Sequence, residues 1–204
     1  MSEASVTARP AEKSDHAGIA ALFARTGSPC FCRWWHFEGD KNAWQDRCAN
    51  APQDNAQELA DAFGAESPQA QGIVALDSAN EIVGWMKLSE SSAVAKIYAQ
   101  RLYRGLPCFD APDAGDAPVW TIGCFLVDER HRGAGVGRAM IRAGLAMARR
   151  AGARAVEAFP RRAEGLAAEE KWTGSFSALR DEGFVVVHDF APYPVVRCDL
   201  TPGS

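Results

Sequence analysis

The sequence lacks an apolar run of the length that crosses a lipid bilayer, which takes about 20 residues. It also lacks an N-terminal stretch in which positive charge is followed by an apolar segment, the pattern of a secretory signal. From these two absences we expect a cytoplasmic protein with no membrane partner. That compartment is reducing, so the six cysteines are expected mostly as thiols: Cys30, Cys32, Cys48, Cys108, Cys124 and Cys198.

An excess of positive charge is absent as well. The formal net charge is −4 at pH 7, which argues against nucleic acid as an electrostatic partner. The charge is nevertheless uneven, because residues 130–156 contain seven arginines and no Asp or Glu. This block favours local attraction of an anionic ligand, although a solvated helix face would have the same composition.

Internal repeats, low-complexity tracts and interdomain linkers are missing too, so 204 residues with 47% hydrophobic content predict one domain over residues 1–204. Apolar patterns predict strands at 6–9, 72–76, 82–88, 119–127, 154–159, 184–187 and 195–200. Helices are expected at about 15–25, 43–48, 55–63, 137–151 and 172–181.

The most informative stretch is the apolar strand 119–127, followed at once by a glycine-rich turn and a helix. Gly133, Gly135 and Gly137 would let the backbone approach an anion, and the helix N-terminus adds partial positive charge. No Gly-Lys-Ser/Thr follows, which excludes a Walker P-loop, and the spacing does not fit Gly-x-Gly-x-x-Gly. A phosphorylated ligand is expected here, with a purely structural turn as the alternative.

The segment Arg132-Gly-Ala-Gly135-Val-Gly137 resembles the acetyl-CoA-binding motif of the GCN5-related N-acetyltransferases (GNAT), Gln/Arg-x-x-Gly-x-Gly/Ala. The order of elements resembles that family over about residues 5–200. A Cys-x-Cys-x-Trp segment at Cys30 resembles an uncharacterised branch of it. The resemblance implies a single-domain α/β acyl-CoA N-acyltransferase fold, with a mixed, mostly antiparallel twisted central sheet flanked by helices.

The resemblance also implies acetyl-CoA as co-substrate. In that family the turn N–H groups hold the pyrophosphate, and the backbone of the preceding strand binds the pantetheine and polarises the thioester. The cofactor-binding residues implied here are Phe125, Leu126, Val127, Arg132, Gly133, Ala134, Gly135, Val136, Gly137 and Arg138.

Transfer to an amine needs a general base, because most amines are protonated at pH 7. Glu157 is the first candidate, since a carboxylate inside the apolar strand 155–159 needs a purpose unless it faces solvent. His36 and Asp128 are further candidates, and Asp128 also suits a cap of the turn. Cys124 is expected either to line the acyl site or to be a small core residue.

The usual general acid is missing. Many members of the resembling family place a Tyr four residues before a Gly-Phe pair, which here is Gly183-Phe184, but this chain has Leu179 at that position. Either another group protonates the leaving thiolate, or the thiolate departs to water, or the protein binds acyl-CoA without efficient turnover.

The aromatic-rich region 27–66 is expected to cover the acceptor site. Its rings would hold an apolar or cationic acceptor, although a hydrophobic cluster beneath a long loop is an equal alternative. The spacing of Cys30, Cys32, His36 and Cys48 does not fit a zinc pattern, so no metal is expected. The predicted acceptor-binding residues are Cys32, Trp34, Trp35, His36 and Trp85.

These features predict an N-acetyltransferase that moves an acetyl group from acetyl-CoA to a primary amine of a small molecule or peptide by direct attack. One alternative is a non-catalytic acyl-CoA-binding or regulatory module of the same fold. Another is a zinc or thiol sensor that uses Cys30 and Cys32. Dimers are common in the resembling family, which leaves a homodimer open.

Overall fold

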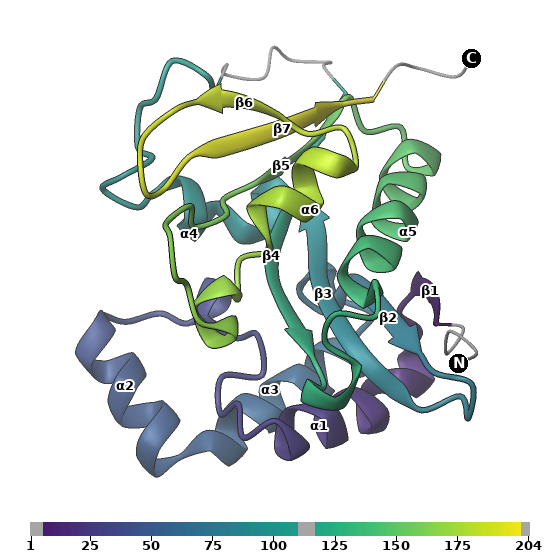
Figure 1. Cartoon of the computed structure of the whole chain (residues 1–204). Helices are drawn as coiled ribbons and strands as arrows, with labels where there is room; N and C mark the ends of the chain where they lie inside the picture. The colour runs from purple at the N-terminus through teal and green to yellow at the C-terminus, as the bar shows by residue number, and fades with distance from the viewer. Residues whose placement is uncertain (1–5, 110–116, 201–204) are drawn as a thin grey trace.

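The fold is a single seven-stranded sheet with helices on both faces, as shown by the computed structural model, which describes residues 6–109 and 117–200 (Figure 1). The strand order is β1-β2-β3-β4-β5-β7-β6. Only the β4–β5 pair is parallel among the paired strands of the described residues. The predicted mixed, mostly antiparallel α/β fold is therefore confirmed.

The strands are β1 (Thr7–Pro10), β2 (Gly72–Leu76), β3 (Ile82–Glu90), β4 (Val119–Val127), β5 (Ala155–Ala158), β6 (Val185–His188) and β7 (Val195–Asp199). The α-helices are α1 (His16–Arg25), α2 (Lys41–Asn50), α3 (Pro52–Gly64), α4 (Ala95–Tyr98), α5 (Val136–Arg150) and α6 (Phe176–Asp181). Short 3₁₀ turns lie at Lys13–Asp15, Trp34–His36, Pro68–Ala70, Ser91–Val94, Glu129–His131 and Ala168–Lys171.

Two apolar layers hold the helices to the sheet. On one face, α5 contributes a stripe that includes Met140, Ile141 and Leu145, and this stripe packs on alternate residues of β2, β3 and β4. On the other face, α1 and α3 pack on the residues in between, such as Trp85. Successive strand side chains point to opposite faces, so one sheet supplies both layers.

Two predicted helix boundaries are wrong. The helix expected at 172–181 begins only at Phe176, because Gly174 has a φ of +103° that no helix continues and Ser175 caps the helix through the N–H of Ala178. The helix expected at 55–63 already starts at Pro52, so the expected cap Asp54 lies inside its first turn.

The sheet opens where β4 leaves β5. The parallel pairing joins Val119–Ile122 of β4 to Ala155–Ala158 of β5 and ends there, whereas β4 continues to Val127. In Figure 1 the lower half of β4 runs on beside β3 with no strand on its other side. An unpaired strand edge presents N–H and C=O groups to whatever lies next to it.

Within the described residues, no helix combines the length and apolar character that a membrane span would need.

Candidate active site

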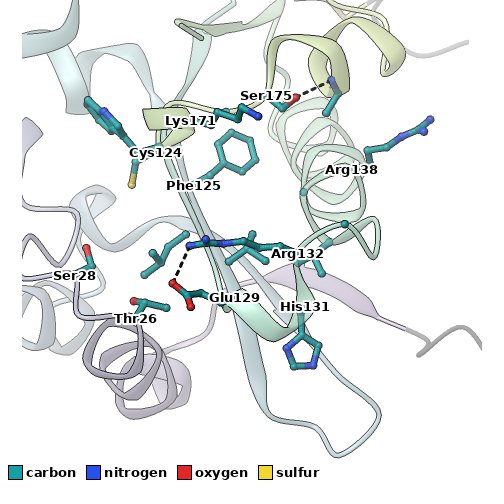
Figure 2. A pocket seen from close by; sticks show the side chains of 18 of the residues that line it. Thr26, Ser28, Cys124, Phe125, Glu129, His131, Arg132, Arg138, Lys171 and Ser175 are labelled. Atoms are coloured by element: carbon teal, nitrogen blue, oxygen red, sulfur yellow. Dashed lines mark hydrogen bonds and ion pairs between the residues drawn. The ribbon is translucent and has the colours of Figure 1, made fainter. Parts of the chain in front are cut away.

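A cavity of about 930 Å³ lies beside the unpaired part of β4. Four segments surround it: the end of α1 with the loop to Cys30, the residues 124–127 of β4, the turn and first residues of α5, and the segment from Lys171 to Ala178. Figure 2 shows side chains from all four directed around one space. The cavity therefore joins the glycine turn to the open strand edge.

The glycine turn leaves its backbone uncovered. Gly133 and Gly135 have φ angles of +79° and +77°, which is the left-handed region that glycine reaches without strain. A Cβ built on Gly133, Gly135 or Gly137 meets no heavy atom within 4 Å. Gly135 is also the N-cap of α5, whose first N–H groups have no partner inside the helix. The turn thus has the room and the polarity to bind an anion.

The arginine block around the turn carries less free charge than its composition indicated. Arg138 and Arg142 both pair with Glu182, at 2.9 and 2.7 Å. Arg142 first, and Arg138 with it, hold the pKa of the Glu182 carboxyl below its usual value. The partner comes from the end of α6, about 40 residues away, so the sequence block could not reveal it.

Two tryptophans cover the open edge of β4. The N–H of Phe125 donates to the carbonyl of Trp172 at 2.6 Å, and the indole Nε1 of Trp35 donates to the carbonyl of Gly123 at 3.1 Å. The rings of Trp35 and Trp172 stack, with centroids 5.7 Å apart and planes at 27°. At Gly123 and Phe125 the strand edge is therefore already occupied, by the side chain of Trp35 and the backbone of Trp172.

The three strand residues expected to bind the cofactor play different parts. Backbone groups alternate in direction along a strand, so Val127 faces the same open edge as Phe125. Leu126 pairs in register with Trp85 of β3, and its own N–H and C=O face that strand. Backbone groups of Phe125 and Val127 therefore face the open edge, where the N–H of Phe125 is already bonded to Trp172, and all three residues line the cavity.

Cys124 lines the cavity and also packs in the apolar core, and it is not a thiol. It forms a disulfide with Cys32, a residue 92 positions earlier in the chain. The expectation of reduced cysteines is therefore wrong for this pair. The disulfide ties the loop after α1 to the middle of the sheet.

Glu157 lies outside the residues that line the cavity. Its side chain is 2% exposed. Its Oε1 accepts from Nε and Nη2 of Arg197 at 3.0 and 2.6 Å, and its Oε2 accepts from the hydroxyl of Tyr98 at 2.6 Å. Burial first, and Glu157 next, raise the pKa of Tyr98. Both carboxylate oxygens therefore have partners, and Glu157 forms a buried ion pair with Arg197. This geometry does not favour Glu157 as a general base.

Neither of the other two candidate bases is suited to take a proton from an amine. Asp128 accepts from the N–H of Arg130 and from the side chains of Arg130 and Arg25, and these contacts hold its pKa well below the usual range. It caps the turn, as the sequence indicated. Burial, with help from Lys87 and Arg33, lowers the pKa of His36 to about 3, so this imidazole is neutral at pH 7.

None of the five residues expected to bind the acceptor lines this cavity. Cys32 is in the disulfide, and Trp35 covers the edge of β4. Trp34 carries the ammonium of Lys96 over its ring at 3.7 Å. Trp85 is fully buried beside Phe63 in the core between the sheet and α1 and α3, so its assignment to the acceptor site is corrected to a core position.

Lys87 is a buried charge that the sequence analysis missed. Its Nζ donates to the carbonyls of Pro68, Gln69 and Gln71 at 3.0, 3.0 and 3.1 Å. Burial, together with the charge of Arg33, lowers the pKa of its ammonium to about 7. The sequence did contain a sign of it: Lys87 is the one charged residue in the apolar strand 82–88, just as Glu157 is in the strand 155–159. Lys87 fixes the 3₁₀ turn Pro68–Ala70 against β3.

Other lining residues also escaped the sequence analysis, among them Thr26, Ser28, Cys30, Lys171, Trp172 and Ser175. They lie in loops without a motif, so no sequence pattern singled them out. In the described part of the chain, no group of three or more His, Cys, Asp or Glu side chains is arranged to hold a metal ion.

Comparisons with known proteins agree with this geometry. The model of the acetyltransferase (GNAT) family matches residues 31–170. A search of curated proteins found no match. Among solved structures, one of histone acetyltransferase HPA2 and related acetyltransferase from Corynebacterium glutamicum is similar, with 19% identity and a TM-score of 0.53 over 98% of this chain and 99% of that one.

Two further structures share the fold at the same TM-score of 0.53. The PaiA N-acetyltransferase from Thermoplasma acidophilum, in complex with coenzyme A, has 7% identity over 96% of this chain and 99% of that one. An acetyltransferase of the GNAT family from Streptococcus pneumoniae has 13% identity over 96% and 99%. These likenesses concern the fold, and the family model extends over most of the chain. The protein belongs to the GNAT acetyltransferase family.

Proposed function

We propose that this protein is an N-acetyltransferase that moves the acetyl group of acetyl-CoA to a primary amine of a small molecule or peptide by direct attack. One observation carries the proposal: a single cavity connects an uncovered glycine turn at a helix N-terminus with the unpaired edge of β4. A long ligand with an anionic end and a hydrogen-bonding arm fits that combination.

The pyrophosphate, which is the anionic end of acetyl-CoA, would lie at the glycine turn. The N–H groups of Val136, Gly137 and Arg138 open α5 and would hold the pyrophosphate, helped by the helix dipole. The open space above Gly133, Gly135 and Gly137 lets a phosphate approach the backbone. Arg132 and Lys171 line the same cavity and add positive charge.

The pantetheine arm of acetyl-CoA would lie along β4. The backbone of Val127 would pair with an amide of the pantetheine, and the N–H of Phe125 would donate to the thioester carbonyl. That N–H would be aimed at the oxygen on which negative charge develops as the amine attacks. In this structure the N–H already donates to Trp172, so acetyl-CoA must displace the carbonyl of Trp172 from the edge.

Proton transfer relies on water in this proposal. Glu157 is engaged by Arg197 and Tyr98, and Leu179 is fully buried with no hydroxyl to offer. Glu129 is the carboxylate among the described residues that line the cavity, and it pairs with Arg132 at 3.8 Å. The acceptor amine therefore loses its proton to water, and the departing CoA thiolate takes a proton from water.

The same contact supports one alternative function. Because the carbonyl of Trp172 already occupies the N–H of Phe125, a protein that held CoA without reaching the strand edge would bind without turnover. Such a protein would be the acyl-CoA-binding or regulatory module that the absent Tyr also suggested.

Thiol release separates the two functions. The purified protein is incubated with acetyl-CoA and a panel of primary amines that includes polyamines, amino acids and peptides with free N-termini, and released CoA thiol is followed. Amine-dependent release supports the transferase. Saturable binding of acetyl-CoA without release for any amine supports the binding module, and absence of binding rejects both.

A further inference from the structure

The disulfide between Cys32 and Cys124 is built into the wall of the cavity. Cys124 lines the cavity beside Phe125, and Figure 2 shows its sulfur on the side of the cavity where Ser28 lies. Cys32 is 4% exposed, packs in the apolar layer with α1 and α3, and does not line the cavity. A ligand in the cavity therefore meets one sulfur of the bond and not the other.

We propose that Cys124 is a site of covalent attachment for the thiol of coenzyme A, through exchange with the Cys32–Cys124 disulfide. This inference rests on the proposed function, because it needs CoA bound with its thiol at the acetyl end. The acetyl group would lie at the N–H of Phe125, which is the residue next to Cys124. Transfer of the acetyl group leaves a CoA thiol at that place.

The step is balanced without any further oxidant. The CoA thiol loses its proton, and its sulfur attacks Sγ of Cys124 in line with the existing bond. The bond between Cys124 and Cys32 breaks, and a new disulfide joins CoA to Cys124. Cys32 leaves as a thiolate and takes up a proton, so one disulfide and one thiol are present before and after.

The environment selects which sulfur is attacked. Exchange requires access to the disulfide sulfur. Cys124, at 7% exposure, is among the residues that line the cavity, whereas Cys32 is not among them. The apolar surroundings of Cys32 destabilise its thiolate and make it a poorer leaving group, so we expect a slow exchange in which Cys32 takes up a proton as it leaves. The leaving thiol is then retained in the apolar layer.

Attachment has two consequences for the site. The bound CoA fills the cavity and excludes acetyl-CoA, so the protein is inactive until a reductant or another thiol removes it. The loop after α1 also loses its covalent tie to β4, because that tie is the disulfide itself. Acetyl-CoA has no free thiol and cannot perform the exchange.

Intact-mass measurement tests the proposal on the whole protein, purified without reductant. Incubation with CoA should add the mass of one CoA per chain, and dithiothreitol should remove it. Acetyl-CoA and desulfo-CoA, which lacks the sulfur, should add nothing. Peptide mapping should place the adduct on Cys124, with Cys32 newly reactive toward a thiol-alkylating reagent.

Three variants test which cysteine takes up CoA. Cys124→Ser should take up no CoA. Cys32→Ser has no disulfide to exchange, so it should ignore CoA thiol and instead take up CoA at Cys124 from the oxidised dimer of CoA. Cys48→Ser, the control, changes a free cysteine that does not line the cavity and should take up CoA like the parent.

Two results on the parent protein overturn the proposal. One is the absence of an adduct in protein that still binds desulfo-CoA, which leaves the proposed function standing. The other is an adduct on Cys30, Cys48 or another cysteine. Failure to bind desulfo-CoA at all would reject the proposed function, and the exchange site with it.

Discussion

The N–H of Phe125 donates a 2.6 Å hydrogen bond to the carbonyl oxygen of Trp172. This contact joins the unpaired edge of β4 to a loop almost fifty residues later, and it fills the position at which we place the thioester. Trp172 is 45% exposed, and its ring stacks on that of Trp35. Cofactor binding is therefore expected to change the surroundings of Trp172.

Tryptophan fluorescence follows that change. Titration with desulfo-CoA should shift the emission of the parent protein, because Trp172 leaves its stack on Trp35 when its carbonyl is displaced. The variant Trp172→Phe should still bind but should lose most of the shift. Trp44→Phe is the control, since Trp44 packs on Trp34 and Phe37 away from the cavity, and its signal should persist.

A bulky side chain at Gly137 should block the pyrophosphate site without harming the fold. Gly137 lines the cavity, has no positive φ, and leaves open space where a Cβ would stand, so Gly137→Trp is free of the backbone strain expected at Gly135. We expect the affinity for CoA to fall by at least about 100-fold, which is about 3 kcal/mol.

Gly64→Trp is the matched control for this variant. Gly64 ends α3, also leaves open space around a Cβ, and does not line the cavity. Both variants should keep the circular dichroism and thermal transition of the parent. Equal CoA affinity in the two variants would remove the glycine turn from the binding site.

The pair of Glu157 and Arg197 should matter for stability rather than for proton transfer. Glu157→Gln leaves a buried guanidinium without its partner charge, which we expect to destabilise the protein by roughly 3–5 kcal/mol. Urea unfolding measures this loss. The folded fraction should keep the pH–rate profile of the parent, and loss of the acidic limb of that profile would instead restore Glu157 as the general base.

Lys87 should make stability depend on pH in the alkaline range. Burial lowers the pKa of its ammonium in the folded protein to about 7, while an unfolded lysine stays near 10.5. Between these values the unfolded chain binds more protons than the folded one, so raising the pH favours folding.

Lys87→Met removes this contribution. Between pH 7 and pH 9.5, the free energy of unfolding of the parent should rise relative to that of the variant, by an amount on the order of 3 kcal/mol. Urea titrations at the two pH values give the comparison. A constant difference between parent and variant would mean that the three carbonyls keep Lys87 protonated throughout this range.

Local patterns predicted the scaffold of the site well. The strands 72–76 and 119–127 and the glycine turn depend on alternating or continuous apolar residues and on φ angles that glycine allows, and these act within a few residues. The helix expected at 172–181 failed for a local reason as well, because Gly174 interrupts it.

The long-range contacts around the cavity could not be predicted from local sequence patterns. Trp35 and Trp172 reach the same strand from opposite ends of the chain, and Cys32 meets Cys124 across 92 residues. The buried charge of Glu157 was visible, but its partner Arg197 lies 40 residues away on β7. A single sequence shows that such a side chain needs a partner and does not show which one it has.

The central claim is that the cavity binds acetyl-CoA, and calorimetric titration of the parent protein with acetyl-CoA tests it most directly. We expect saturable heat from one site per chain, repeated with desulfo-CoA because binding needs no thiol. Heat no greater than that of dilution at high micromolar concentrations of both ligands would contradict the account, and the glycine turn would then be a structural feature only.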